Sequence, residues 1–338
     1  MNKKKWTLTG RIAAVAAIVL FQAITLAGAK EVVTFGYLAD PSHEAVLWAL
    51  RNGKVTSETI DVQATGLQIS ALIQATSART YDVIETAAMA IPRAREHGLD
   101  LLIIGSGLRY HTSGEGAGIW VKKDSPIKTI ADLKGKKLAV YSLGSAGITL
   151  VRIALHDVYG LNVSLKGGDL DFVEMPSPAM PAALATGKVD AAALIHAQAY
   201  LAQKTGEFRV IGQTAQDLTK KFKLRMVSAV LAGYGDKLRA KPEVYREFQR
   251  ILHASMEYAI ARPEEVYPEV GKQFKIEPDF FKAWFTRFSD FPVVLSEQDA
   301  KAISLLWEKA KELDILKSYP PVQETIWSGA LTEKALGK

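Results

Sequence analysis

From residue 32 onward, short apolar runs alternate with segments of helical periodicity, and this alternation constrains the fold more than any other feature. Such alternation is typical of α/β layering around a mostly parallel sheet, with helices on its faces. We therefore predict an α/β fold. Predicted strands cover residues 32–37, 60–64, 81–85, 100–104, 119–121, 137–140, 171–175, 189–195 and 210–211. Predicted helices in the first 200 residues cover residues 68–77, 89–97, 148–159 and 181–186, with another after residue 42 and a small one that stops at Gly135.

Two segments suit passage between separate folding units. Residues 105–118 contain five glycines and are too irregular for a regular element, whereas residues 224–232 are long and largely apolar. After Asp236 the pattern is helical, and 338 residues suffice for two medium-sized cores. The helices predicted in this last part cover residues 242–261, 263–274, 278–288 and 296–316.

The first 29 residues form a pattern of their own. Lys3, Lys4, Lys5 and Arg11 precede an uncharged apolar run that ends before small residues at positions 27–29. This run is shorter than the roughly 20 residues that span a bilayer. We therefore predict a cleavable secretory signal peptide and a periplasmic protein.

Composition then excludes several classes of function. The leader holds four of the 42 Lys and Arg and none of the 36 Asp and Glu, so 38 basic and 36 acidic residues leave a net charge of +2. We expect no nucleic-acid partner, since that needs clustered basic residues on one face. The chain has no Cys, which removes disulfides, thiol nucleophiles and thiolate metal sites. The six His residues show no recognised metal-ligand spacing, so no metal and no cofactor is expected.

Several signatures together resemble the substrate-binding proteins of nitrate-, sulfonate- and taurine-type ABC importers. The matching stretches begin with Phe35-Gly36-Tyr37 and include QISAL at residues 68–72 and YDV at residues 81–83. The most specific are DSPIKTIADLKGKKLAV at residues 124–140 and AALATGKVDAA at residues 182–192. The similarity extends over nearly the whole chain after the leader.

The resemblance implies a two-lobed type II periplasmic binding fold, in which each lobe is a mostly parallel sheet flanked by helices. Lobe I would comprise residues 30–110 and 233–338, and lobe II residues 111–232. The hinge crossings would lie near residues 108–118 and 224–232. The resemblance also implies a monomer that captures a small organic anion between its lobes, performs no chemistry on this anion, and delivers it to an inner-membrane ABC permease.

The loop at residues 142–147 is the strongest candidate binding element. It follows a predicted strand (KLAV, residues 137–140) and precedes a predicted helix, so unpaired N–H groups and the positive end of the helix dipole would face a ligand. Ligands of open α/β sheets bind beyond the carboxyl ends of the strands. The alternative is that Ser and Gly only cap the helix. The candidates here are Ser142, Leu143, Gly144, Ser145 and Ala146.

Other predicted strand ends supply further candidates. Tyr37, Ala39, Ser42, Thr86 and Ala87 belong to the first lobe, where Ser42 is equally well explained as an N-cap. The second lobe supplies Ser177 and His196, and His196 would lie at the edge of the cleft.

The first crossing segment adds Arg109 and Tyr110. Arg109 has the planar fork that clamps a carboxylate or sulfonate, although an ion pair with Glu115 is an equal alternative. Tyr110 and Tyr37 are candidates to stack on a flat ligand, and Tyr141 is a weaker one because it belongs to a strand.

Two other functions stay open beside transport. Pyrimidine-precursor synthases of thiamine biosynthesis resemble the same binding proteins. The first alternative to transport is therefore a thiamine-precursor binder or synthase-like protein on this fold. Those synthases carry a Cys-rich motif, which this chain lacks. The second alternative to transport is a ligand-sensing subunit that reports to a membrane receptor.

Overall fold

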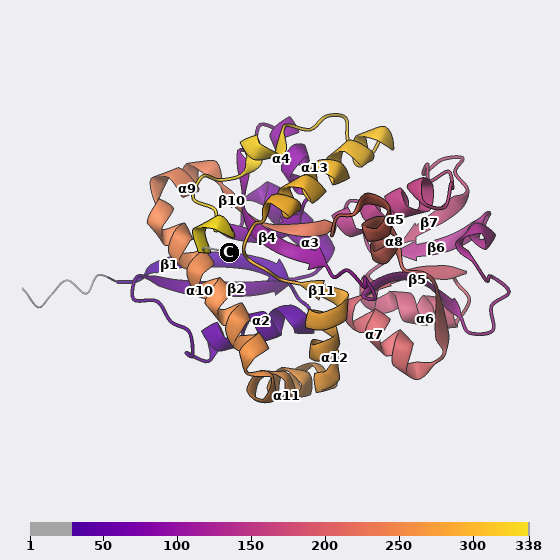
Figure 1. The fold of residues 1–338 in the computed structure, drawn as a ribbon, viewed down its shortest axis with the longest axis horizontal. Coiled ribbons are helices and arrows are strands. Elements are labelled where there is room, and N and C mark those ends of the chain that lie inside the picture. Colours follow the sequence, from indigo (N-terminus) through magenta and orange to yellow (C-terminus); the bar gives the residue numbers. More distant parts are fainter. Residues whose placement is uncertain (1–28, 337–338) are drawn as a thin grey trace, which may run out of the picture.

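The computed structural model describes residues 29–336, and its strands form two mixed sheets in two α/β lobes that lie side by side (Figure 1). The predicted signal peptide lies almost wholly outside the described residues. The six-stranded sheet has the spatial order β11 (Ser289–Asp290), β4 (Leu101–Tyr110), β10 (Val227–Tyr234), β3 (Val83–Ala87), β1 (Glu31–Leu38) and β2 (Ile60–Leu67). The five-stranded sheet has the order β7 (Leu170–Glu174), β6 (Lys136–Val140), β8 (Ala191–Ile195), β5 (Ala117–Lys122) and β9 (Phe208–Gly212).

Strand directions follow one scheme in both sheets. β1 pairs in parallel with β2 and β3, and β6 pairs in parallel with β7 and β8. β10 runs antiparallel to β3 and β4, and β5 runs antiparallel to β8 and β9. The chain enters the second sheet after β4 and returns to the first in β10. The predicted α/β two-lobed fold class is confirmed, and the exact lobe boundaries stay a prediction.

Helices cover both sheets, and α10 packs along α2 beside the first sheet (Figure 1). Within residues 29–336, no helix has the length and apolar character needed to cross a bilayer. The first sheet is accompanied by α2 (Pro41–Arg51), α3 (Ile69–Ala78), α4 (Ala90–Glu96), α9 (Gly235–Ala240), α10 (Pro242–Ala261), α11 (Pro263–Phe274), α12 (Pro278–Ala283) and α13 (Glu297–Glu312). The second is accompanied by α5 (Ala146–Asp157), α6 (Met180–Ala185), α7 (His196–Thr205) and α8 (Thr214–Phe222).

The segment predicted to be irregular, residues 105–118, is partly a strand, because β4 continues to Tyr110. Its glycines allow neighbouring backbones to approach. A Cβ on Gly105 would lie 2.1 Å from the carbonyl oxygen of Val293, and one on Gly107 would lie 3.2 Å from backbone atoms of β10. The glycines therefore mark close packing here and not a loop. Helices α7 and α8 were not predicted.

The turn after β1 is organised by Asp40. Its side chain accepts a hydrogen bond from the backbone nitrogen of Ser42 at 3.0 Å, and Pro41 occupies the first helical position of α2. Asp40 is therefore the N-cap, and the alternative of Ser42 as N-cap is wrong. The Ser42 hydroxyl is left to bond side chains.

Candidate functional site

A mostly apolar cavity of about 70 Å³ lies between the two lobes. Strands, loops and helices of both lobes line it, so a bound molecule would touch both lobes. The first lobe supplies Leu38, Ile69, Leu72, Ile73, Glu85, Thr86, Ala87, Leu108, Tyr110, Ser228 and Ala229. The second lobe supplies Tyr141, Ser145, Ala146, Gly147, Ile195 and His196.

The start of α5 forms part of the wall of this cavity. Ser145 is the N-cap, and its hydroxyl accepts a hydrogen bond from the backbone nitrogen of Ile148 at 3.2 Å. Gly147 follows in the first turn, and a Cβ there would lie 1.9 Å from the hydroxyl oxygen of Tyr141. Glycine is therefore needed at this position to leave room for the Tyr141 side chain.

A continuous chain of buried polar side chains joins two sides of the cavity. We call it the polar chain: Glu85, His43, Ser42, Asp40 and His196, each of which is at most 7% exposed. Oε1 of Glu85 lies 3.0 Å from Nε2 of His43, and Nδ1 of His43 lies 3.2 Å from the hydroxyl of Ser42.

The polar chain continues from Ser42 to the other lobe. The hydroxyl of Ser42 donates to Oδ1 of Asp40 at 2.6 Å, and Oδ2 of Asp40 lies 3.2 Å from Nδ1 of His196. Glu85 and His196, its two ends, both line the cavity. With His43 protonated at both ring nitrogens, every proton between the five side chains has an acceptor, so the polar chain is fully hydrogen-bonded.

The charges of the polar chain shift its pKa values. Burial raises the pKa of Asp40, but the charge and hydrogen bond of His196, with smaller contributions from His43 and Ser42, outweigh it and lower the pKa to about 2. Burial lowers the pKa of His43, yet the neighbouring carboxylate of Glu85, and then those of Asp40 and Glu44, raise it above its usual value. Asp40 is therefore a carboxylate at neutral pH, which favours a proton on Nδ1 of His196.

His196 is held in an unusual conformation at the cavity. It has a φ of 52°, in the left-handed region that few non-glycine residues adopt. Its backbone nitrogen donates to the carbonyl of Gly116 at 3.2 Å, and the ring of Trp284 packs against its imidazole with centroids 4.6 Å apart. Among the described residues only Nδ1 of the imidazole has a hydrogen-bond partner. Nε2 is therefore available to a molecule in the cavity.

The structure brings only part of the predicted site together. Thr86, Ala87, Tyr110, Ser145, Ala146 and His196 line the cavity, and Ser42 belongs to the polar chain. Tyr37 does not line it; its hydroxyl hydrogen-bonds Glu44 at 2.5 Å. The other candidates outside the lining are Ala39, Arg109, Ser142, Leu143, Gly144 and Ser177.

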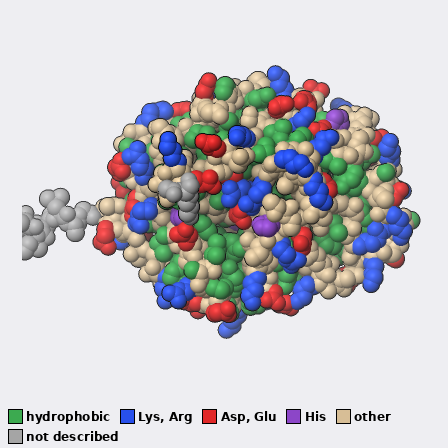
Figure 2. Space-filling model, in the orientation of Figure 1, with side chains coloured by type: hydrophobic (Ala, Val, Ile, Leu, Met, Phe, Trp, Pro, Cys, Tyr) green, Lys and Arg blue, Asp and Glu red, His purple; other side chains and the backbone are tan. Residues whose placement is uncertain are grey.

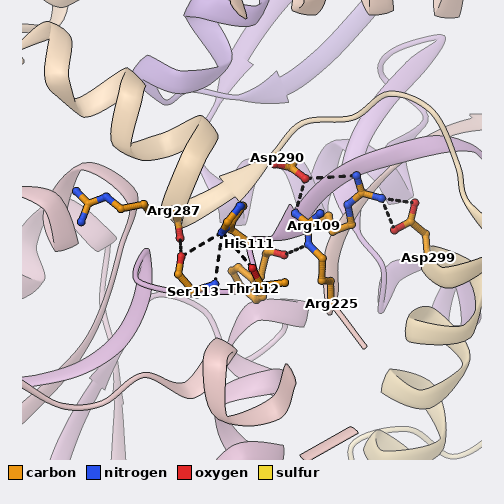
Figure 3. Close-up of polar contacts among 9 residues, drawn as sticks. Arg109, His111, Thr112, Ser113, Arg225, Arg287, Asp290 and Asp299 are labelled. Atoms are coloured by element: carbon orange, nitrogen blue, oxygen red, sulfur yellow. Dashed lines mark hydrogen bonds and ion pairs between the residues drawn. The ribbon is translucent and has the colours of Figure 1, made fainter. Parts of the chain in front are cut away.

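Arg109 lies instead in a group of ion pairs beside the predicted hinge crossings, which we call the hinge network: Arg109, Arg225, Asp290 and Asp299 (Figure 3). Its guanidinium lies 3.2 Å from Asp299 and 3.3 Å from Asp290. Arg225 pairs with Asp290 and donates from Nε to the carbonyl of Tyr110 at 2.8 Å. The alternative pairing with Glu115 is wrong, because Glu115 pairs with Arg287 at 2.5 Å.

Sequence reasoning missed Asp40, His43 and Glu85. Glu85 carried a signal, because it is a charged residue near the end of an otherwise apolar strand, where an unpaired carboxylate is costly. The pairing of His43 with Glu85, 42 residues away, depends on the neighbouring positions of β1 and β3.

Two α/β lobes with a lined cavity between them define a type II periplasmic binding fold, and comparison with solved structures agrees. The aliphatic sulphonate-binding protein SsuA of Escherichia coli superposes with a TM-score of 0.70 at 16% identity, over 90% of this chain and 94% of that one. The alkanesulfonate-binding protein SsuA of Xanthomonas axonopodis pv. citri, bound to MOPS, gives 0.69 at 18% identity, over 89% and 99%. A protein of Archaeoglobus fulgidus gives 0.69 at 21% identity, over 84% and 98%.

The family is set by a different comparison. The family model described as menaquinone biosynthesis matches residues 33–312, so this chain belongs to that family. None of the curated proteins matches the chain. Membership in a biosynthetic family supports a biosynthetic protein on this fold better than it supports the component of an importer that we expected.

Proposed function

We propose that the protein acts in menaquinone biosynthesis, by binding a small planar molecule between its lobes and moving a proton on it. The family match over residues 33–312 supports the pathway. The mostly apolar walls of the cavity support a flat, largely apolar ligand, such as a precursor of the bicyclic ring of a quinone.

The polar chain is the observation that carries the chemical part of the proposal. Asp40 orients the imidazole of His196 through Nδ1, which leaves Nε2 to exchange a proton with the ligand. Glu85 faces the same cavity from the other end of the chain. Buried charged neighbours shift the pKa values of Asp40 and His43, and such shifted values are typical of sites that move protons.

Capture and delivery of a solute to an ABC permease from the periplasm is the second candidate. The leader-like sequence of residues 1–29 favours it, as does the likeness in fold to sulfonate-binding proteins. The lining of the cavity contains no Lys or Arg to neutralise a sulfonate, which favours the first candidate.

The menaquinone content of the source cells tests the proposal. Deleting the gene should lower menaquinone, and the wild-type gene on a plasmid should restore it. The variant His196→Gln, which keeps a polar side chain but transfers no proton, should accumulate as folded protein without restoring menaquinone. Unchanged menaquinone in the deletion strain would overturn the pathway assignment, and restoration by His196→Gln would overturn the proton transfer.

A further inference from the structure

The second lobe has two ends, and the interlobe cavity lies at one of them. The cavity is lined by residues at the ends of β6 and β8, such as Tyr141 and His196. We call the opposite end, where β5 ends and β6, β7 and β8 begin, the outer end. β6 has five residues, so the two ends are roughly 17 Å apart. In Figure 1, β6 and β7 extend away from the first lobe.

Lysines gather at the outer end. Residues 122–137 contain six Lys and two Asp, a net charge of +4, whereas the whole chain after the leader carries +2. Lys166 and Lys188 precede β7 and β8 at the same end. Seven of these eight lysines are exposed, and Lys136 is half-buried. We call them the lysine pole: Lys122, Lys123, Lys128, Lys134, Lys136, Lys137, Lys166 and Lys188.

Half of the six carboxylates at the outer end are held against the backbone. Asp132, Asp169 and Asp190 accept hydrogen bonds from backbone nitrogens at 2.8–2.9 Å. The others are Asp124, Asp171 and Glu207. Among residues 29–336, the one ion pair of the lysine pole joins Lys134 to Asp169 at 3.8 Å. A lysine side chain reaches further from the backbone than an aspartate does, so a broad anionic surface would meet the ammonium groups first.

One apolar side chain is exposed beside the lysines. Leu165 directly precedes Lys166 in the loop before β7, and its exposed fraction of 56% is the highest of the large apolar residues between positions 29 and 336. The backbone nitrogen of Gly135 donates to the carbonyl of Asp169 at 2.7 Å, which joins this loop to the start of β6. The phosphate backbone of a nucleic acid offers no apolar surface to a leucine, whereas the boundary between lipid headgroups and acyl chains buries apolar side chains that have basic neighbours.

We propose that the lysine pole docks the protein on a membrane surface that contains anionic phospholipids, with Leu165 inserted between the headgroups. Lysines close to such a surface are attracted to it, and several of them add up to measurable binding. The interlobe cavity lies at the opposite ends of β6 and β8, so docking in this orientation does not cover it. The inference goes beyond the proposed function and does not depend on it.

Vesicle flotation tests the proposal, with phosphatidylcholine vesicles that contain or lack phosphatidylglycerol. The pole variant combines Lys122→Gln, Lys137→Gln and Lys188→Gln. The control variant combines Lys220→Gln, Lys221→Gln and Lys223→Gln, and it removes the same charge from exposed lysines at the end of α8, close to β10 of the first sheet. Both are made in the full chain, so any lipid binding by residues 1–28 is the same in each. Circular dichroism and thermal unfolding check that each variant is folded.

Wild type should bind the vesicles that contain phosphatidylglycerol, and it should bind them more weakly as salt rises, because salt screens surface charges. The pole variant should bind about 10- to 100-fold more weakly than wild type, since three attracted lysines are lost. The control variant should stay within about threefold of wild type. Absence of binding by wild type, or equal weakening of both variants, would overturn the proposal and would leave a soluble polyanion or a protein as the partner of the lysine pole.

A fluorescent label at position 165 shows which part of the protein touches the lipid. The chain has no Cys, so Leu165→Cys takes a single environment-sensitive fluorophore. The control is Ile260→Cys on α10 of the first lobe, where the side chain is 47% exposed. Vesicles with phosphatidylglycerol should shift the emission of the label at position 165 to shorter wavelength and leave the label at position 260 unchanged. Vesicle binding without a shift at position 165 would show that another part of the chain binds lipid, and it would overturn the proposal.

Discussion

Two polar networks connect segments that are distant in sequence, and they differ in what their side chains face. The hinge network pairs each arginine with aspartates, and its charges satisfy one another (Figure 3). The polar chain is more deeply buried, and both of its ends face the interlobe cavity. The space-filling view shows Lys, Arg, Asp and Glu side chains interspersed over the visible face, so surface charge does not mark the site there (Figure 2). The polar chain is therefore set apart by reaching the interlobe cavity, whereas Arg109 and Asp290 of the hinge network line a separate cavity.

The largest expected effect is a loss of function when the polar chain is changed. Replacing His196 with Gln should lower the rate of menaquinone accumulation by roughly 10²- to 10⁴-fold, the usual contribution of a general acid or base. A pulse of labelled precursor followed by extraction of menaquinone measures this rate. If His196→Gln supported menaquinone accumulation at more than half the wild-type rate, the polar chain would have no more part in function than the hinge network.

The next largest effect is a loss of stability when the hinge network is changed. Replacing Arg109 with Gln leaves the fully buried carboxylate of Asp299 without its cation, which should cost about 3 kcal/mol of unfolding free energy. Urea denaturation at pH 7 measures the loss. The affinity of the folded variant for 2-naphthol, a flat neutral probe of the interlobe cavity, should stay within threefold of wild type. A large loss of affinity with no loss of stability would make Arg109 a ligand residue after all.

Acid should reveal the ion pair inside the polar chain. The pKa of Asp40 is about 2 in the folded protein, below its ordinary value of 3.8, so its stabilisation is complete above about pH 4 and is lost as the pH falls towards 2. The difference corresponds to about 2 kcal/mol. The gap in unfolding free energy between wild type and Asp40→Asn should therefore shrink by that amount from pH 5 to pH 2. A gap that is constant over this range would show that the pair with His196 does not form.

The smallest effect compares two glycines at the start of α5. A Cβ at position 147 would overlap the Tyr141 hydroxyl, so Gly147→Ala should displace this tyrosine and weaken binding of 2-naphthol about tenfold, in keeping with 1–2 kcal/mol of overpacking. At Gly144 a Cβ would meet Ile73 at 3.6 Å, an ordinary contact, so Gly144→Ala should bind normally. The reverse order of affinities would contradict the placement of the cavity wall.

Much of the architecture could be predicted from the sequence, because strands and helices carry periodic patterns of apolar residues. Residues 242–261 and 263–274 were predicted with the boundaries that α10 and α11 have. The strand at residues 105–110 was missed because glycine in a strand signals close backbone packing only when the neighbouring strand is known. Helix α7 was missed because its first residue, His196, was assigned to a loop.

The site was harder to predict, since a side chain's partner depends on tertiary contacts. Arg109 was expected on a crossing segment and His196 at a strand end, and both were expected at the ligand, yet one meets two aspartates and the other lines the cavity. Glu85 and His43 meet only because β1 and β3 are neighbours in the sheet. The loop at residues 142–147 contributes Ser145, Ala146 and Gly147, whereas Ser142, Leu143 and Gly144 lie outside the lining.

A crystal structure of the protein with 2-naphthol tests the central claim most directly, because it shows where the ring lies. We expect the ring between Leu38 and Ile195, near Nε2 of His196. Density for the ring beside Arg109 in the hinge network, with the interlobe cavity filled only by solvent, would contradict the account.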